Sequence, residues 1–130
     1  MNTPPSKILL IDDDKLIIEL IKSKLENEGY EVLTAYDGAE AFEFIDQQPD
    51  LIITDILMPH LSGLELLRIL KNKMFSEIPV IVISQLEGDD TIYEALETGA
   101  VDFMGKPINT KELLIRVKMI LSRIDSLKSS

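Results

Sequence analysis

Cysteine is absent from the sequence, and basic side chains are scarce in it. Without cysteine the chain can form neither a disulfide nor a thiolate metal site. Thirteen Lys and Arg residues against 23 Asp and Glu residues give a formal net charge of −10. Surfaces for nucleic acids and for anionic membranes need clustered basic residues, so the charge argues against both functions. It is compatible instead with a cation ligand or a basic partner.

Long hydrophobic runs are absent too. The longest, such as residues 8–11 and 78–83, are far shorter than the roughly 20 residues that span a bilayer. The first residues, MNTPPSK, contain no apolar stretch of the kind found in signal peptides. We therefore expect a cytoplasmic protein without membrane contact. Its 130 residues, 45% of them hydrophobic, suit a single domain with a substantial core.

What the sequence does contain is an alternation of short apolar runs and longer amphipathic segments. The apolar runs predict five strands, at residues 7–11, 31–35, 50–54, 78–84 and 101–104. The amphipathic segments predict five helices, which cover residues 17–28, 37–48, 61–72, 89–98 and a last stretch from Asn109 or Thr110 to Leu127. Five strand–helix repeats indicate an α/β fold with a parallel sheet and helices on both faces.

Charged residues follow three of the predicted strands. Asp12, Asp13 and Asp14 come after the first strand, Asp55 after the third and Lys106 after the fifth. Ligands of open parallel sheets bind at the carboxyl ends of the strands, where the strand order reverses. If the first and third strands are neighbours, their carboxylates converge there and repel one another unless a cation joins them. Carboxylate oxygens with room for water favour Mg²⁺.

Each of these residues also has an ordinary structural interpretation. The aspartates at 12–14 can cap the first helix, because negative charge is favourable at a helix N-terminus. Lys106 can be a surface lysine. Ser84, which ends the fourth predicted strand, can be a turn former.

Taken together and in order, the motifs are more specific than any one of them. They are the acid pair Asp12–Asp13, TDILMP at 54–59, Ser84, the Lys106–Pro107 pair, DGAEAF at 37–42 and TGAVDFMGKP at 98–107. This set resembles the receiver domain of two-component response regulators. The resemblance covers about residues 7–123, which leaves residues 1–6 as a flexible tail and residues 124–130 as the end of the last helix and its tail. It implies a flavodoxin-like fold with strand order 2-1-3-4-5.

The resemblance also implies a role for each matched residue at the metal site. Asp55 would be the phosphoacceptor. Asp13 and Asp55 would ligate Mg²⁺, or Mn²⁺ in its place, and Asp12 would reach the metal through water. The backbone carbonyl of Leu57 would complete the protein ligands.

Further matched residues would respond to the phosphoryl group. Lys106 would pair with its oxygens, and the hydroxyl group of Ser84 would donate a hydrogen bond to one of them. Phe103 occupies the position of a switch aromatic, which would turn inward when Ser84 moves. The peptide bond between Lys106 and Pro107 would be cis, a conformation found essentially only before proline.

The implied function is signalling and not metabolic catalysis. A histidine kinase or a phosphotransfer protein would donate the phosphoryl group, and the surface of the fourth helix, fifth strand and fifth helix would control an output protein or domain. A pseudo-receiver that binds a partner constitutively is the main alternative. Enzymes on related sheets are disfavoured: Leu57 stands where a dehalogenase-like phosphatase needs an acid, and three aspartates would repel the phosphate of a flavin.

Two features remain open. Gln85 follows Ser84 where the family usually has a small residue, so it can crowd the site or contact the phosphoryl group and alter the lifetime of the acyl phosphate. Apolar residues of the last helix step by four and three, which is a heptad pattern. They are Leu113, Val117, Ile120, Ile124 and Leu127. The first part of the pattern is expected to pack on the sheet, and its continuation suggests either a phosphorylation-linked homodimer or a helix that once continued into an output domain.

Overall fold

The structure is a computed structural model that describes residues 4–58, 61–72, 77–85 and 89–129, except for the side chains of residue 89 and residues 125–129. Pro59, the last residue of the TDILMP motif, and the side chain of Leu127 lie outside the described residues. Strands and helices alternate along the chain. They are β1 (Lys7–Ile11), α1 (Lys15–Asn27), β2 (Glu31–Ala35), α2 (Gly38–Ile45), β3 (Leu51–Asp55), α3 (Gly63–Lys71), β4 (Val80–Ser84), α4 (Asp89–Thr98), β5 (Asp102–Gly105) and α5 (Thr110–Ser129).

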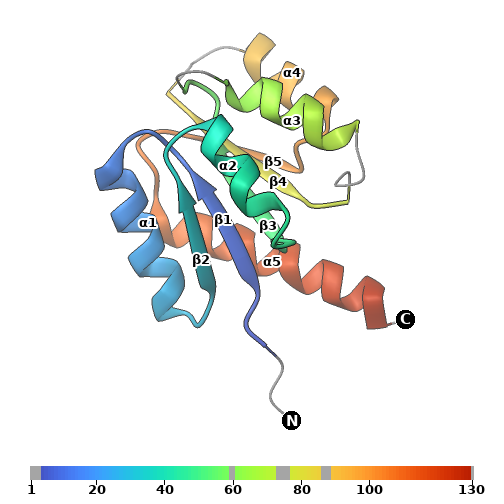
Figure 1. Ribbon diagram of the computed structural model, residues 1–130. Helices are drawn as coiled ribbons and strands as arrows, with labels where there is room; N and C mark the ends of the chain where they lie inside the picture. The colour runs from blue at the N-terminus through green and yellow to red at the C-terminus, as the bar shows by residue number, and fades with distance from the viewer. Residues whose placement is uncertain (1–3, 59–60, 73–76, 86–88, 130) are drawn as a thin grey trace.

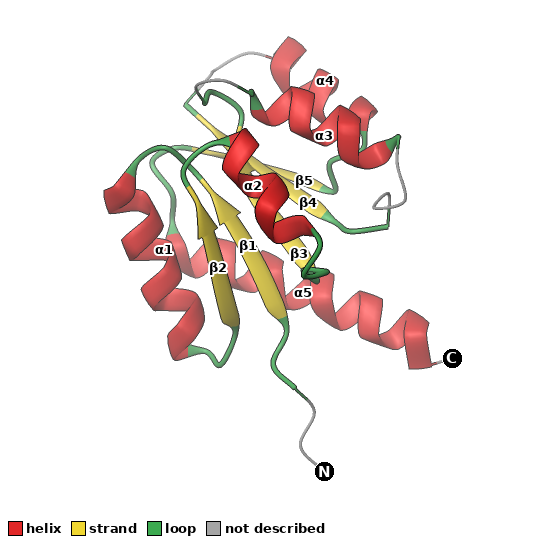
Figure 2. Cartoon of the chain, viewed as in Figure 1, coloured by secondary structure: helices red, strands yellow, loops and turns green. Residues whose placement is uncertain are grey.

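The five strands form one parallel sheet in the order β2-β1-β3-β4-β5, which confirms the predicted topology. The order reverses between β1 and β3, so the ends of these two neighbouring strands lie next to each other. Helices cover both faces: α1 and α5 lie on one side of the sheet, and α2, α3 and α4 lie on the other (Figures 1 and 2). None of the described helices is long and apolar enough to cross a membrane.

The strands supply both halves of the core. Alternate residues of a strand point to opposite faces of the sheet. Thus Ile8 and Leu10 pack with α1 and α5, whereas Leu9 and Ile11 pack with α2, α3 and α4. Every residue of β3 and β4 is buried, which is why these segments read as continuous apolar runs and not as alternating ones.

Some predicted strand boundaries were wrong. The third strand was placed at 50–54, but Asp50 precedes the ladder because its carboxylate accepts a hydrogen bond from the backbone N–H of Lys7 at 2.7 Å. As a result Asp55 is the last residue of β3 and not the first residue after it. β4 starts only after Pro79, which has no N–H to donate to a neighbouring strand. β5 is likewise shifted by one residue toward the C-terminus.

Two predicted helices were too long. α2 ends at Ile45 because the chain then turns, and Gln48 adopts a φ of 56° that a right-handed helix does not accommodate. α3 begins at Gly63 and not at Leu61, since the side chain of Ser62 caps it.

The apolar face of α1 does not include all of its leucines. Because an α-helix has 3.6 residues per turn, Leu20 points away from the sheet, and 57% of its surface is exposed.

The interpretation of the aspartate triplet as helix caps is correct for one of its members. Asp14 caps α1, and its Oδ1 accepts hydrogen bonds from the backbone N–H groups of Leu16 at 2.9 Å and Ile17 at 3.4 Å. Asp12 accepts from the N–H of Asp14 at 2.8 Å. Asp12 and Asp13 make no contact with the N-terminal turn of α1 in the described hydrogen bonds, so capping does not account for them.

Gly63 lets α3 approach the end of β3. Its N–H donates to the carbonyl oxygen of Ile56 at 2.9 Å. A Cβ atom on residue 63 would lie only 2.1 Å from the carbonyl oxygen of Asp55, which is a severe overlap with main chain. The absence of a side chain at Gly63 therefore helps to fix the backbone that carries Asp55.

We predict that Gly63→Ala lowers the free energy of unfolding by about 2–3 kcal/mol, because the added methyl group must displace main-chain atoms. Gly105→Ala is the control: a Cβ there meets nothing within 4 Å, so the change should stay within about 0.5 kcal/mol. Urea denaturation followed by circular dichroism measures both. Equal effects of the two substitutions would contradict this account of Gly63.

Candidate functional site

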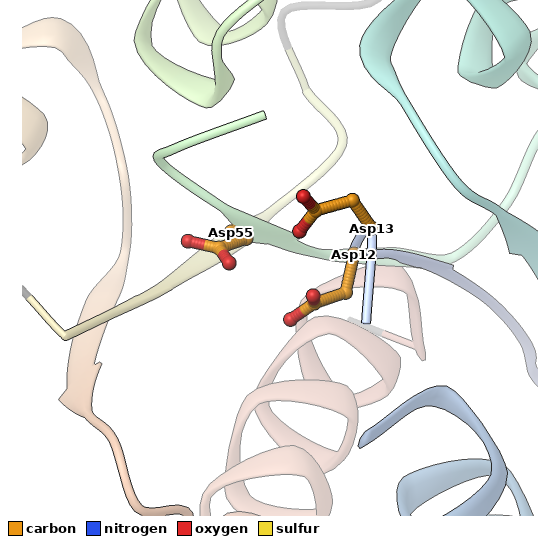
Figure 3. A group of neighbouring side chains, drawn as sticks. All are labelled: Asp12, Asp13 and Asp55. Atoms are coloured by element: carbon orange, nitrogen blue, oxygen red, sulfur yellow. The ribbon is translucent and has the colours of Figure 1, made fainter. Parts of the chain in front are cut away.

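Three carboxylates converge at the carboxyl ends of β1 and β3. Asp12 and Asp13 follow β1, and Asp55 ends β3; one ligand oxygen from each lies within 4.8 Å of the others (Figure 3). Asp12 is fully buried, Asp55 is 5% exposed and Asp13 is exposed. The cluster thus extends from the interior of the sheet edge to the surface.

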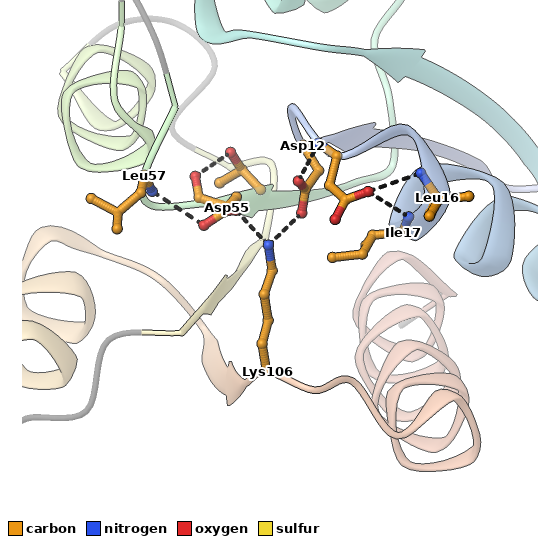
Figure 4. Close-up of polar contacts among 8 residues, drawn as sticks. Asp12, Leu16, Ile17, Asp55, Leu57 and Lys106 are labelled. Atoms are coloured by element: carbon orange, nitrogen blue, oxygen red, sulfur yellow. Dashed lines mark hydrogen bonds and ion pairs between the residues drawn. The ribbon is translucent and has the colours of Figure 1, made fainter.

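Lys106 joins two of these carboxylates. Its Nζ lies 2.6 Å from Asp55 Oδ2 and 3.0 Å from Asp12 Oδ2, and only 8% of its side chain is exposed (Figure 4). The position of Lys106 is set by its own main chain, because its N–H donates to the carbonyl oxygen of Ser84 at 2.9 Å. The peptide bond from Lys106 to Pro107 is cis.

The electrostatics reflect crowded charge. Burial raises the pKa of the Asp12 carboxyl, and the nearby charge of Asp55 adds to the increase, although the hydrogen bond from the backbone of Asp14 and the ammonium group of Lys106 oppose it. Burial alone would lower the pKa of Lys106, but its hydrogen bond to Asp55 and its charge interactions with Asp55 and Asp12 outweigh burial and raise it. One ammonium group therefore compensates two buried carboxylates, with Asp13 beside them.

The residues present fit a divalent cation. Asp12 Oδ2 is a buried oxygen that lies near Lys106 Nζ but has no hydrogen-bond partner among the described residues. Buried oxygens usually have a hydrogen-bond partner, and Asp12 shares Lys106 with Asp55, so a second cation or an ordered water would complete the contacts of this oxygen. The neighbouring donors are all carboxylate oxygens, the type of ligand that Mg²⁺ prefers.

A pocket of about 340 Å³ opens over this cluster. It is lined by Asp13, Asp14, Asp55, Leu57, Gln85 and Lys106. The backbone N–H of Leu57 donates to Asp55 Oδ1 at 3.1 Å, so this residue orients the carboxylate as well as lining the pocket. Gln85, singled out by its size, stands on the wall of the pocket together with Asp55 and Lys106.

Ser84 and Phe103 are not among the residues that line this pocket. Ser84 is 1% exposed and ends β4, next to the strand that carries Asp55. Phe103 pairs with Val82 across β4 and β5 and is half-buried against the α2, α3 and α4 side of the core. Because residues 82 and 84 point to the same face of β4, Ser84 and Phe103 share that face.

Sequence reasoning missed two contributors to the site. The buried Thr54 donates its hydroxyl to the carbonyl oxygen of Asp55 at 3.0 Å, and Gly63 leaves room for that carbonyl. A threonine inside an apolar strand and a Ser–Gly pair before a helix were the only available signals. Neither is specific enough to identify a contact with Asp55.

Known proteins place this arrangement in a family. The family described as the response regulator receiver domain matches the chain over residues 8–118. The chain belongs to this family. Receiver domains are signalling domains, and they bind Mg²⁺ at an acidic pocket of the kind formed here by Asp12, Asp13 and Asp55.

Individual receiver domains are similar over nearly the whole chain. The transcriptional regulatory protein CpxR of Escherichia coli (strain K12) is 37% identical over 118 residues, which make up 91% of this chain and 50% of CpxR. This chain therefore spans about half the length of the curated relatives that it matches.

Solved structures share the fold. The Francisella response regulator 1452 receiver domain superposes with a TM-score of 0.87 at 38% identity, over 92% of this chain and 98% of that chain. A CheY-like receiver domain from Methanospirillum hungatei JF-1 superposes with a TM-score of 0.88 at 29% identity, over 94% and 98% of the two chains.

We predict that Lys106→Met lowers the free energy of unfolding by about 3 kcal/mol near pH 7, because it leaves buried carboxylates without a cation. The deficit should shrink as the pH is lowered, since protonation of Asp12, whose pKa burial raises, removes part of the uncompensated charge. Urea denaturation at several pH values measures both effects.

The exposed Lys111 of α5 provides a matched control, and Lys111→Met should change little. Adding Asp12→Asn to Lys106→Met should recover part of the lost stability, because it removes one of the buried charges. A deficit that is the same at every pH, or that Asp12→Asn deepens, would show that lost packing and not charge explains the effect.

Proposed function

We propose that this receiver domain takes a phosphoryl group onto Asp55 in a reaction that requires Mg²⁺. The contact between Lys106 Nζ and Asp55 Oδ2 at 2.6 Å, inside a group of three carboxylates, is the main support. A carboxylate that is fixed at a strand end and held beside a buried ammonium group is positioned as a nucleophile and not as a base.

The chemistry needs placement and charge more than reactive groups. A carboxylate oxygen of Asp55 forms a bond to phosphorus while the bond from phosphorus to the donor's histidine nitrogen breaks. The donor's ring, which carries a proton on its other nitrogen, keeps the bonding electrons and leaves as neutral imidazole. Lys106 remains to neutralise the phosphoryl oxygens. Asp12, Asp13, Asp55 and the carbonyl of Leu57 would hold Mg²⁺, which supplies further positive charge there.

A switch would follow from the added phosphoryl oxygens. Ser84 would move to hydrogen-bond one of them, and Phe103, on the same face of the sheet, would turn into the space that it leaves. Ligands of this kind bias an equilibrium between existing conformations. The surface of α4, β5 and α5 would then present a different shape to an output partner.

The partners follow from the family. A histidine kinase or a phosphotransfer protein would be the donor, and a cytoplasmic location would bring the two together. CpxR is a transcriptional regulatory protein, so an output domain or protein that acts on transcription is one candidate. A homodimer through the far end of α5 also remains a proposal: Leu113 and Val117 are buried in the core, whereas Ile124 is half-buried.

The central experiment is intact-mass measurement after incubation with phosphoramidate, with Mg²⁺ or with EDTA. We expect a gain of one phosphoryl group that requires Mg²⁺ and Asp55. Asp55→Asn should abolish it, and Asp14→Asn, which changes a pocket carboxylate that caps α1, should retain it. No gain in any condition would favour the pseudo-receiver, which binds its partner without phosphorylation.

Gln85 provides a separate prediction about the lifetime of the acyl phosphate. Its side chain stands on the pocket wall, so Gln85→Ala should admit water to the phosphoryl group and shorten the lifetime. The change should stay within about tenfold, the equivalent of one hydrogen bond of roughly 1.4 kcal/mol. Loss of the phosphorylated mass over time measures it, and a longer lifetime in Gln85→Ala would mean that Gln85 assists hydrolysis.

A further inference from the structure

The edge of the sheet at β5 has backbone groups that no strand can satisfy. β5 is the last strand and pairs only with β4. Successive residues of a strand direct their N–H and C=O groups to opposite edges. Because the N–H of Lys106 points toward β4, where it donates to Ser84, the groups of Met104 face β4 and those of Phe103 face the open edge.

At the open edge of β5, side chains form hydrogen bonds with the backbone groups of Phe103. The carboxylate of Asp102 accepts from the N–H of Phe103 at 2.8 Å. Arg116 of α5 donates from Nη1 to Asp102 Oδ1 at 2.6 Å and to the carbonyl oxygen of Phe103 at 3.3 Å. Its Nη2 donates to Glu112 Oε1 at 2.7 Å, which holds the guanidinium from its own helix. Both backbone groups of Phe103 thus have a partner that depends on Arg116.

We infer that Arg116 is a positioning residue of the phosphorylation switch, one that fixes the main chain of Phe103 so that its ring turns about a stationary backbone. The effect on the switch rests on the proposed function, whereas the contacts of Arg116 with Asp102 and Phe103 do not. The two sides of β5 have different tasks: Phe103 packs toward α2, α3 and α4, whereas Arg116 holds the strand from α5.

The contacts of Arg116 are better suited to orienting the main chain of Phe103 than to stabilising the fold. The side chains of Arg116, Asp102 and Glu112 are 32%, 28% and 50% exposed, and ion pairs so exposed contribute little to the free energy of folding. A planar guanidinium can donate in several directions at once, whereas lysine acts as a point charge. What Arg116 supplies is therefore the direction of its hydrogen bonds.

The first measurement is amide hydrogen exchange at Phe103 and Met104, in the protein without phosphoryl donor. Arg116→Gln should speed exchange at Phe103 by about tenfold, the equivalent of one charge-assisted hydrogen bond, and leave Met104 unchanged because its N–H bonds to β4. Arg116→Lys should fall between. Arg123→Gln removes the same charge from an exposed position of α5 and is the matched control.

The second measurement follows the ring of Phe103 by ¹⁹F NMR in protein labelled with 4-fluorophenylalanine, before and after phosphoramidate and Mg²⁺. The Phe103 signal is identified by its loss in Phe103→Leu. In Arg116→Gln we expect the shift difference between the two states to fall by about half or more, with the phosphorylation rate of Asp55 within about twofold of the wild type.

The outcomes separate this inference from the proposed function. Failure of the wild type to gain a phosphoryl group refutes the proposed function, and exchange at Phe103 still decides whether Arg116 fixes the main chain. Unchanged exchange in Arg116→Gln, or faster exchange at Phe103 and Met104 alike, refutes the positioning role. So does a full ¹⁹F response in a phosphorylated Arg116→Gln variant.

Discussion

The site depends on one ammonium group placed between two buried carboxylates. Lys106 Nζ lies 2.6 Å from Asp55 Oδ2 and 3.0 Å from Asp12 Oδ2, and its positive charge offsets the cost of burying both carboxylates at the carboxyl end of the sheet. The compensation is incomplete, because Asp13 adds a third charge and Asp12 Oδ2 lacks a hydrogen-bond partner among the described residues. The remaining negative potential is what makes this pocket suitable for a divalent cation, and a bound cation in turn makes it suitable for a phosphoryl group.

The parallel sheet makes this arrangement possible at little conformational cost. Three strands bring Asp12, Asp55 and Lys106 to one edge, although Asp55 and Lys106 are 51 residues apart in the sequence. β3 is buried along its whole length and β1 from Ile8 onward, so the core fixes the positions of the side chains at the ends of these two strands. Small adjustments complete the geometry: Gly63 and Thr54 fix the carbonyl of Asp55, and Leu57 orients its carboxylate.

Strand order and the converging acids could be predicted because both follow from patterns that extend over many residues. The alternation of apolar runs and helical periods indicates the layers, and the family resemblance supplies the order 2-1-3-4-5. Boundaries were harder, since they depend on single local contacts such as the bond from Lys7 to Asp50 or the cap at Ser62. The aspartate triplet illustrates the limit: adjacency in sequence cannot separate Asp14, which caps a helix, from Asp12 and Asp13, whose oxygens lie close to those of Asp55.

β5 connects the charge chemistry to the surface. Lys106, directly after β5, forms an ion pair with Asp55. Phe103, within the strand, packs on the opposite side of the sheet from α5. At the open edge of the strand, Arg116 of α5 donates a hydrogen bond to the main chain. A strand this short, with one hydrogen-bonded neighbour, would move as a whole when any of these contacts changed. If α5 holds the main chain of β5 in place, a movement of Lys106 would turn the ring of Phe103 and would not displace the whole strand. In the proposed switch, stiffness at this edge would be a condition for transmitting a signal, and the ion pairs of Arg116 would set the direction of the motion more than the stability of the fold.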